Sequence, residues 1–239
     1  MSAADDTRRA ELAANLARVR ARIDAARSAA GRTDEVTLVA VTKTYPVSDV
    51  ALLADLGVTD VGENRDQEAA PKAAEIGDRV RWHFVGQLQR NKVKSVSGYA
   101  DVVQSVDSVR LATALDRAAA GHGRIVDVLL QVSLDADAQR GGALPGDADP
   151  DRGLDPTAAA VADAGALRLA GLMAVAPLGV PPEKAFARLA EIAAAFQVDH
   201  PTATVLSAGM SDDLESAVSY GATHVRIGSA LLGKRHWLG

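Results

Sequence analysis

The chain has 239 residues, no cysteine and a formal net charge of −5, which suits one α/β domain and excludes disulfides, thiolate metal sites and cysteine nucleophiles. Its basic residues are scattered, which argues against nucleic acid as a partner, and no apolar run approaches the ~20 residues that span a membrane. The first nine residues are polar, so we expect no export signal and a cytoplasmic protein.

Residues 8–28 are predicted to form an amphipathic helix, because apolar side chains recur there at helical spacing. After Gly31, short apolar runs alternate with helical stretches. The runs that we interpret as strands are 36–42, 58–62, 81–85, 101–104, 125–132, 168–173, 203–207 and 223–227. Ser48 and Ser211 are predicted to cap the helices that end before Gly57 and Gly221.

This alternation permits either a closed barrel or an open doubly wound sheet. A dinucleotide-binding sheet requires a glycine-rich turn after its first strand, whereas this chain has Thr42-Lys43-Thr44-Tyr45-Pro46 there. We therefore predict one α/β domain over residues 1–239, a (β/α)8 TIM barrel with an extra N-terminal helix. Residues 133–157 are rich in Asp, Gly and Pro, which predicts a long flexible loop.

Polar or small residues end most of the predicted strands, and in a barrel such positions meet at one mouth. The residues gathered in this way are Lys43, Glu63, Asn64, His83, Gly86, Gln87, Gln104, Ser105, Gln131, Ser133, Met173, Ser207, Gly209, Ser211, Arg226, Gly228 and Ser229.

The last two strand–helix turns have the composition of an anion site. They read Ser207-Ala208-Gly209-Met210-Ser211 and Arg226-Ile227-Gly228-Ser229. Glycine lets backbone N–H groups approach an anion, and barrel phosphate sites favour the turns after strands seven and eight. Asp212 and Asp213 argue against an anion unless their side chains point outward. On residues alone, phosphate binding and ordinary turn chemistry are equally open.

Lys43 at the end of the first strand has two interpretations. Such a lysine often extends its ammonium group into solvent. Alternatively, burial lowers its pKa from the usual ~10.4, so that the amine attacks an aldehyde. A lysine on strand one facing a phosphate site on strands seven and eight is the arrangement that a phosphorylated aldehyde cofactor requires.

Five segments of the chain together resemble the YggS/PROSC-type pyridoxal phosphate (PLP) homeostasis proteins, a PLP-binding family similar to the N-terminal domain of alanine racemases. The segments are Val41-Thr42-Lys43-Thr44; Gly62-Glu63-Asn64 with Gln67-Glu68; Trp82-His83-Phe84-Val85-Gly86 with Leu88-Gln89 and Asn91-Lys92; Gly171-Leu172-Met173-Ala174; and 206–213 with 225–233.

The resemblance implies PLP as the cofactor, Lys43 as its Schiff-base lysine and Arg226 beside its pyridine nitrogen. It implies Asn64 in the pocket wall and the last two turns around the phosphate, and it assigns His83 no chemical step. The cofactor-binding residues that we predict are Lys43, Asn64, Met173, Ser207, Gly209, Met210, Ser211, Arg226, Gly228 and Ser229, with no catalytic residue and no metal ligand.

Two positions depart from the family pattern. Many relatives carry a lysine in the loop after strand five, where this chain reads Ala138-Gln139-Arg140-Gly141-Gly142, so a second, PLP-transferring lysine is not carried over. The family's threonine after the last-strand glycine is Ser229 here, which keeps the hydroxyl group.

The predicted ring partner argues against strong catalysis. PLP enzymes that break bonds at Cα often protonate the ring nitrogen with a carboxylate, whereas Arg226 only donates and discourages carbanion formation. Alanine racemases resemble this site but also use a tyrosine from a C-terminal β domain across a dimer. We expect that domain to be absent, since the chain ends at Gly239 soon after strand eight, and we interpret Tyr45 as pocket lining or surface.

The favoured hypothesis is a monomeric, non-enzymatic protein of intracellular PLP homeostasis. It holds PLP as a Schiff base and supplies it to apo PLP-dependent enzymes through transient contact. Two alternatives stay open, a racemase-like enzyme acting on a small amino acid and a phosphate-binding barrel enzyme without PLP.

Overall fold

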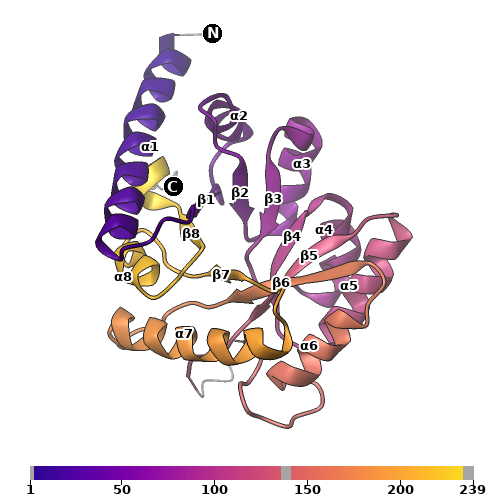
Figure 1. Cartoon of the computed structure of the whole chain (residues 1–239). Coiled ribbons are helices and arrows are strands. Elements are labelled where there is room, and N and C mark those ends of the chain that lie inside the picture. The colour runs from indigo at the N-terminus through magenta and orange to yellow at the C-terminus, as the bar shows by residue number, and fades with distance from the viewer. Residues whose placement is uncertain (1–2, 136–140, 234–239) are drawn as a thin grey trace.

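The fold is a closed barrel of parallel strands, as predicted (Figure 1). A computed structural model describes residues 3–135 and 141–233. The strands follow one another around the barrel in chain order, from β1 to β8, and β1 pairs with β8 to close it. The helices lie around the strands, and α1 runs along the outside of α8 (Figure 1).

Each predicted strand run overlaps one observed strand, although β2, β4 and β6 extend one or two residues beyond the predicted bounds. The strands are β1 (Thr37–Val41), β2 (Asp60–Glu63), β3 (Arg81–Phe84), β4 (Val102–Val106), β5 (Val126–Gln131), β6 (Leu167–Met173), β7 (Val205–Ser207) and β8 (His224–Ile227). The helices are α1 (Ala3–Ala29), α2 (Val47–Asp55), α3 (Asp66–Ile76), α4 (Val93–Tyr99), α5 (Val109–Gly121), α6 (Leu154–Ala162), α7 (Pro182–Asp199), α8 (Leu214–Ser219) and α9 (Ser229–Leu232), with 3-10 turns η1 (Gly77–Arg79) and η2 (Arg90–Lys92).

Both predicted helix caps are wrong. Helix α2 begins at Val47, directly after Pro46, so Ser48 lies inside its first turn. Helix α8 begins only at Leu214, with Asp213 at its N-cap. The Ser211 hydroxyl accepts a hydrogen bond from the Ala230 backbone N–H at 3.3 Å, because the turn after β8 lies against the turn after β7.

The segment predicted as a long loop, 133–157, is shorter than expected, because α6 already begins at Leu154. Isolated bridges pair Val132 with Ala143 and Leu144 with Gly153, which ties this segment to the end of β5. Residues 138–140, where relatives carry the extra lysine, lie outside the described residues. The flexibility of the loop stays a prediction.

The apolar core lies mainly between the strands and the surrounding helices. Inside the barrel, the apolar cluster is confined to Val102, Leu129 and Met173 with a few partly buried neighbours. Barrel interiors are usually filled by branched aliphatic side chains, so this one is unusually polar. The buried polar side chains that link together there are Asp60, His83, Gln104, Ser207 and Arg226.

The extra N-terminal helix supports the last turn of the barrel. The buried Asn15 side chain donates to the Leu231 carbonyl at 2.8 Å, and Arg8 donates to the Leu232 carbonyl at 3.0 Å. These bonds satisfy carbonyl groups at the end of α9 that have no partner within so short a helix. Helix α1 therefore fixes the segment that begins with Ser229. None of the helices in residues 3–135 and 141–233 is long and apolar enough to cross a membrane.

Candidate functional site

A cavity of about 400 Å³ opens at the carboxyl ends of the strands, where barrel chemistry is expected. The predicted site residues that line it are Lys43, Asn64, Met173, Met210, Ser211, Arg226, Gly228 and Ser229. Two other predicted residues, Ser207 and Gly209, are not in its wall. The amine of strand one and the turns after strands seven and eight therefore share one cavity.

Several strand-end residues that we expected at the mouth lie elsewhere. Glu63, His83, Gln104 and Ser207 are buried and do not line the cavity, so the prediction that they converge on the mouth is wrong. Successive side chains of a strand point to opposite sides, and position along the chain does not show which side faces a cavity. Gln104 and Ser207 point into the barrel, whereas Glu63 contacts α3.

Helix α3 holds the backbone on both sides of Lys43. Before it, the Lys72 ammonium group donates to the Thr42 carbonyl at 2.9 Å. After it, the Thr44 backbone N–H donates to the Glu68 carboxylate at 2.7 Å. Thr44 has a φ of +70°, the one positive φ of a non-glycine residue in the described ranges. This conformation is unfavourable for threonine and persists only where surrounding contacts enforce it.

Lys72 is held in turn by a buried carboxylate. Glu63 Oε1 accepts hydrogen bonds from Lys72 Nζ and Thr42 Oγ1, both at 2.6 Å. Burial raises the pKa of the Glu63 carboxyl group, and the bonds from Lys72 and Thr42 offset this only in part. Within the described residues, Glu63 Oε2 has no hydrogen-bond partner. The Glu63–Lys72 pair therefore holds the turn that carries Lys43, but it does not line the cavity.

The turn after β7 is tightly packed. Gly209 has a φ of +87°, and a Cβ atom at this position would lie 2.5 Å from the Ala217 Cβ, so only glycine fits. The Met210 backbone N–H donates to the Asp213 carboxylate at 2.6 Å, and Asp212 lines the cavity. Asp212 and Asp213 therefore do not both point outward, which was the condition we set for an anion site in this turn. An anion here would have to displace Asp213 from this N–H group or use the neighbouring donors.

Arg226 is buried beneath the cavity, with 5% of its surface exposed. Its Nη1 donates to Ser207 Oγ at 2.7 Å and its Nη2 to the Ala174 carbonyl at 2.9 Å. Burial lowers the pKa of the Arg226 guanidinium to about 10, and the charge of Asp213 offsets this in part. Arg226 forms no ion pair with any described residue. Because a guanidinium group only donates, it suits a ligand atom that accepts.

Sequence reasoning missed several residues of the cavity wall, namely Val41, Val85, Val175, Asp212 and Gly233. Gly86, which we expected at the mouth from its place after the third strand, does line the cavity, and a Cβ atom there would lie 2.2 Å from the Asn64 carbonyl oxygen. Tyr45 lines the cavity as we interpreted it, and its hydroxyl donates to the Gly233 carbonyl at 2.7 Å.

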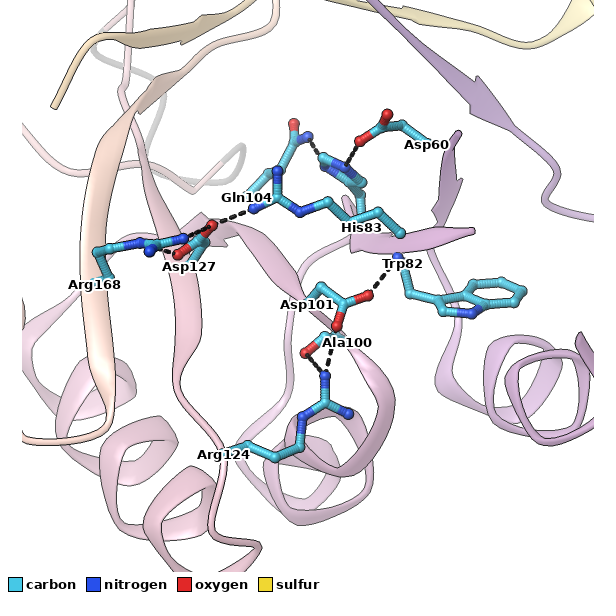
Figure 2. A network of polar contacts seen from close by, with 10 residues as sticks. Asp60, Trp82, His83, Ala100, Asp101, Gln104, Arg124, Asp127 and Arg168 are labelled. Carbon is cyan, nitrogen blue, oxygen red and sulfur yellow. Dashed lines mark hydrogen bonds and ion pairs between the residues drawn. The ribbon is translucent and has the colours of Figure 1, made fainter. Parts of the chain in front are cut away.

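The opposite end of the barrel carries charged groups that pair with one another (Figure 2). Asp127 accepts hydrogen bonds from Arg168 and pairs with Arg81. Asp60 accepts from His83, and although burial would raise the pKa of Asp60, bonds from His83 and Thr59 hold it below its usual value. Across the described residues, no cluster of His, Asp and Glu has the geometry of a metal site.

Comparison with known proteins gives the site its context. Residues 14–236 match the family described as alanine racemase, N-terminal domain. The chain is 43% identical to the pyridoxal phosphate homeostasis protein of Mycobacterium leprae, over 95% of this chain and 93% of that one.

Solved structures that share its fold include PipY and an alanine racemase. PipY of Synechococcus elongatus, solved with PLP bound, is 35% identical, with a TM-score of 0.79 over 93% of this chain and 100% of that one. Alanine racemase of Corynebacterium glutamicum is 17% identical, with a TM-score of 0.69 over 96% of this chain and 62% of that one, which shows a common fold only. The chain belongs to the alanine racemase N-terminal domain family and, within it, to the pyridoxal phosphate homeostasis proteins.

Proposed function

We propose that this protein binds PLP in the cavity at the carboxyl ends of the strands, as a Schiff base on Lys43, and serves intracellular PLP homeostasis. The observation that carries the proposal is that Lys43 lines the same cavity as Ser211, Gly228 and Ser229. An amine and a phosphate site on opposite rims would have excluded one bridging ligand. The PLP bound to PipY and the name of the mycobacterial relative support the same cofactor.

The residues in the cavity fit each end of PLP. Lys43 is the amine for the aldehyde, and the hydroxyl groups of Ser211 and Ser229 lie in the turns assigned to the phosphate. Arg226 offers donors to the ring nitrogen. When bound, PLP supplies an aldehyde and a ring that withdraws electrons. The turn after β7 fits least well, because Asp213 accepts the Met210 N–H.

A carrier fits these residues better than a strong catalyst. Arg226 donates and so favours the unprotonated ring, which is a poor electron sink. The one tyrosine in the cavity wall, Tyr45, has its hydroxyl bound to the Gly233 carbonyl. Val175 and Met210 are 48% and 40% exposed at the cavity rim, so the site is within reach of an apo-enzyme that receives PLP.

The second candidate is a racemase-like enzyme acting on a small amino acid. The match to the alanine racemase N-terminal domain and the place of Tyr45 in the cavity favour it. A sensitive racemisation assay with the PLP-loaded protein separates the two functions. We expect no turnover beyond that of free PLP, and robust turnover that Tyr45→Phe abolishes would establish the enzyme instead.

The cofactor and its lysine are tested together by the visible spectrum of the purified protein before and after borohydride. We expect an imine band that reduction converts into a stable adduct on the peptide containing Lys43. Lys43→Ala should abolish the band, and Lys184→Ala, at an exposed position on α7, should keep it. A protein without the band, or with its adduct on another lysine, would contradict the proposal.

The state of assembly and the transfer step are tested separately. We propose a monomer, which light scattering checks, and an obligate dimer would contradict it. For transfer, the PLP-loaded protein should restore activity to a PLP-requiring apo-enzyme faster than release into buffer allows. Equal rates with the protein and with a matched concentration of free PLP would argue for storage alone.

A further inference from the structure

Five buried polar side chains form one continuous hydrogen-bonded chain through the barrel interior. Arg226 Nη1 bonds to Ser207 Oγ at 2.7 Å, and Ser207 Oγ bonds to Gln104 Oε1 at 2.7 Å. Gln104 Nε2 then bonds to His83 Nδ1, and His83 Nε2 to Asp60 Oδ1, both at 2.8 Å. Figure 2 shows the last three of these residues in line. The chain joins the cavity to the opposite end of the barrel.

The two ends of this chain fix the direction of every bond in it. Arg226 only donates and the Asp60 carboxylate only accepts. Ser207 therefore accepts from Arg226 and gives its own proton to Gln104. The Gln104 amide then turns its oxygen to Ser207 and its nitrogen to His83. His83 therefore accepts at Nδ1 from Gln104 and donates from Nε2 to Asp60. Burial keeps water from substituting for any partner, since Ser207 and Gln104 are 0% exposed and His83 is 1% exposed.

Gln104 decides how Ser207 is oriented. The Ser207 hydroxyl can rotate, and it accepts from Arg226 most favourably when its own proton has an acceptor elsewhere, which Gln104 Oε1 provides. The guanidinium group has few other anchors, because it forms no ion pair with a described residue and is otherwise held by the Ala174 carbonyl. Removal of Gln104 would leave both the Ser207 proton and the His83 Nδ1 atom without a partner.

We propose that Gln104 is a positioning residue for cofactor binding: through Ser207 it holds Arg226 facing the cavity, while His83 and Asp60 fix the orientation of the Gln104 amide. The proposal rests on the function proposed above, because the ring nitrogen of PLP is the acceptor that Arg226 serves. Gln104 itself does not line the cavity, so its effect on the cofactor must pass through Arg226.

The test compares the dissociation constant for PLP of the full-length wild-type protein with that of Gln104→Met. Methionine has a similar volume, so packing is largely kept. Ser105→Ala is the matched control, since Ser105 is the next residue on β4, is 2% exposed and has no hydrogen-bond partner for its hydroxyl in the described residues. We expect about a tenfold weaker affinity for Gln104→Met and a change within about twofold for Ser105→Ala.

A double-mutant cycle with Arg226→Met separates positioning from a general loss of structure. In the Arg226→Met background, Gln104→Met should change the dissociation constant by less than about twofold, because there is no guanidinium group left to orient. In the native background it should also shift the visible band of bound PLP, since the ring nitrogen changes its partner. Equal weakening in both backgrounds, or equal weakening by Ser105→Ala, would overturn the proposal.

If Gln104→Met fails to fold, Asp60→Asn takes its place in the double-mutant cycle with Arg226→Met. The amide oxygen still accepts from His83, but the charge that ends the chain is removed. We expect about two- to threefold weaker PLP binding that disappears in the Arg226→Met background, and persistence there would overturn the proposal. A wild-type protein that binds no PLP would overturn the proposed function itself, whereas wild-type binding with additive mutant effects would overturn the positioning role alone.

Discussion

The two ends of the barrel differ in how their charged side chains are arranged. At the amino end of the strands, Asp127 binds Arg168 and Arg81, so each charge there has its partner within the protein. At the carboxyl end, Lys43 and Arg226 line a cavity, and Arg226 has no ion pair with a described residue. The comparison teaches that the charges paired around Asp127 serve stability, whereas Arg226 at the other end faces a cavity and is available to the ligand that we propose.

The Glu63–Lys72 pair tests this comparison, because it lies near the cavity and yet its two charges pair with each other. Lys72→Met leaves Glu63 buried without a cation, so we expect the free energy of unfolding to fall by about 3–5 kcal/mol in urea denaturation. The double variant Glu63→Gln/Lys72→Met should recover much of this loss. Lys94→Met, at an exposed position, is the control, with an expected change within about 0.5 kcal/mol. A single variant no less stable than the double would contradict this account.

His224, at the amino end of the strands, should make the free energy of unfolding depend on pH. Burial lowers the pKa of His224 from 6.5 to about 4. The unfolded chain therefore takes up this proton more readily, so stability present above pH 6.5 is lost as the pH falls toward 4. We expect a loss on the order of 2 kcal/mol in urea unfolding, and His224→Asn should flatten the profile. An unchanged profile in the variant would show that other groups cause the loss.

Asp127→Asn tests most directly whether the ion pairs at the amino end serve stability alone. It removes the charge that holds Arg168 and Arg81, and much of that pairing is screened because Arg168 is largely exposed. We expect a loss of about 1–2 kcal/mol in unfolding free energy. The dissociation constant for PLP should stay within about twofold of the wild-type value. A larger change in affinity would mean that the ion pairs of Asp127 also serve the ligand.

Asp213→Asn tests whether a carboxylate at the carboxyl end competes with the phosphate of PLP, and it has the smallest expected effect. The Asp213 carboxylate competes with an anion for the Met210 N–H and also repels it. Removing this charge should strengthen PLP binding by about two- to fivefold, a gain below about 1 kcal/mol. The control is pyridoxal, which lacks the phosphate and should bind both proteins equally. Weaker PLP binding by the variant would show that Asp213 shapes the turn rather than competing.

Much of the site could be predicted because it depends on position along the chain. Lys43 and the two glycine- and serine-bearing turns come directly after strands, and in a closed barrel every such turn lies at the same mouth. The choice between a barrel and an open sheet also followed from local sequence, since residues 42–46 lack a dinucleotide-binding turn.

The sequence alone determined the barrel, the extra helix and the turns that meet at the cavity, because strand periodicity and turn composition are local properties of the chain. The tertiary structure decided which side chains use those positions. Ser211 faces the cavity while Ser207 points into the barrel toward Gln104, 103 residues away in the chain. The orientation of a side chain depends on how strands twist, pair and close around one another, and the buried partners that fix it come from distant segments.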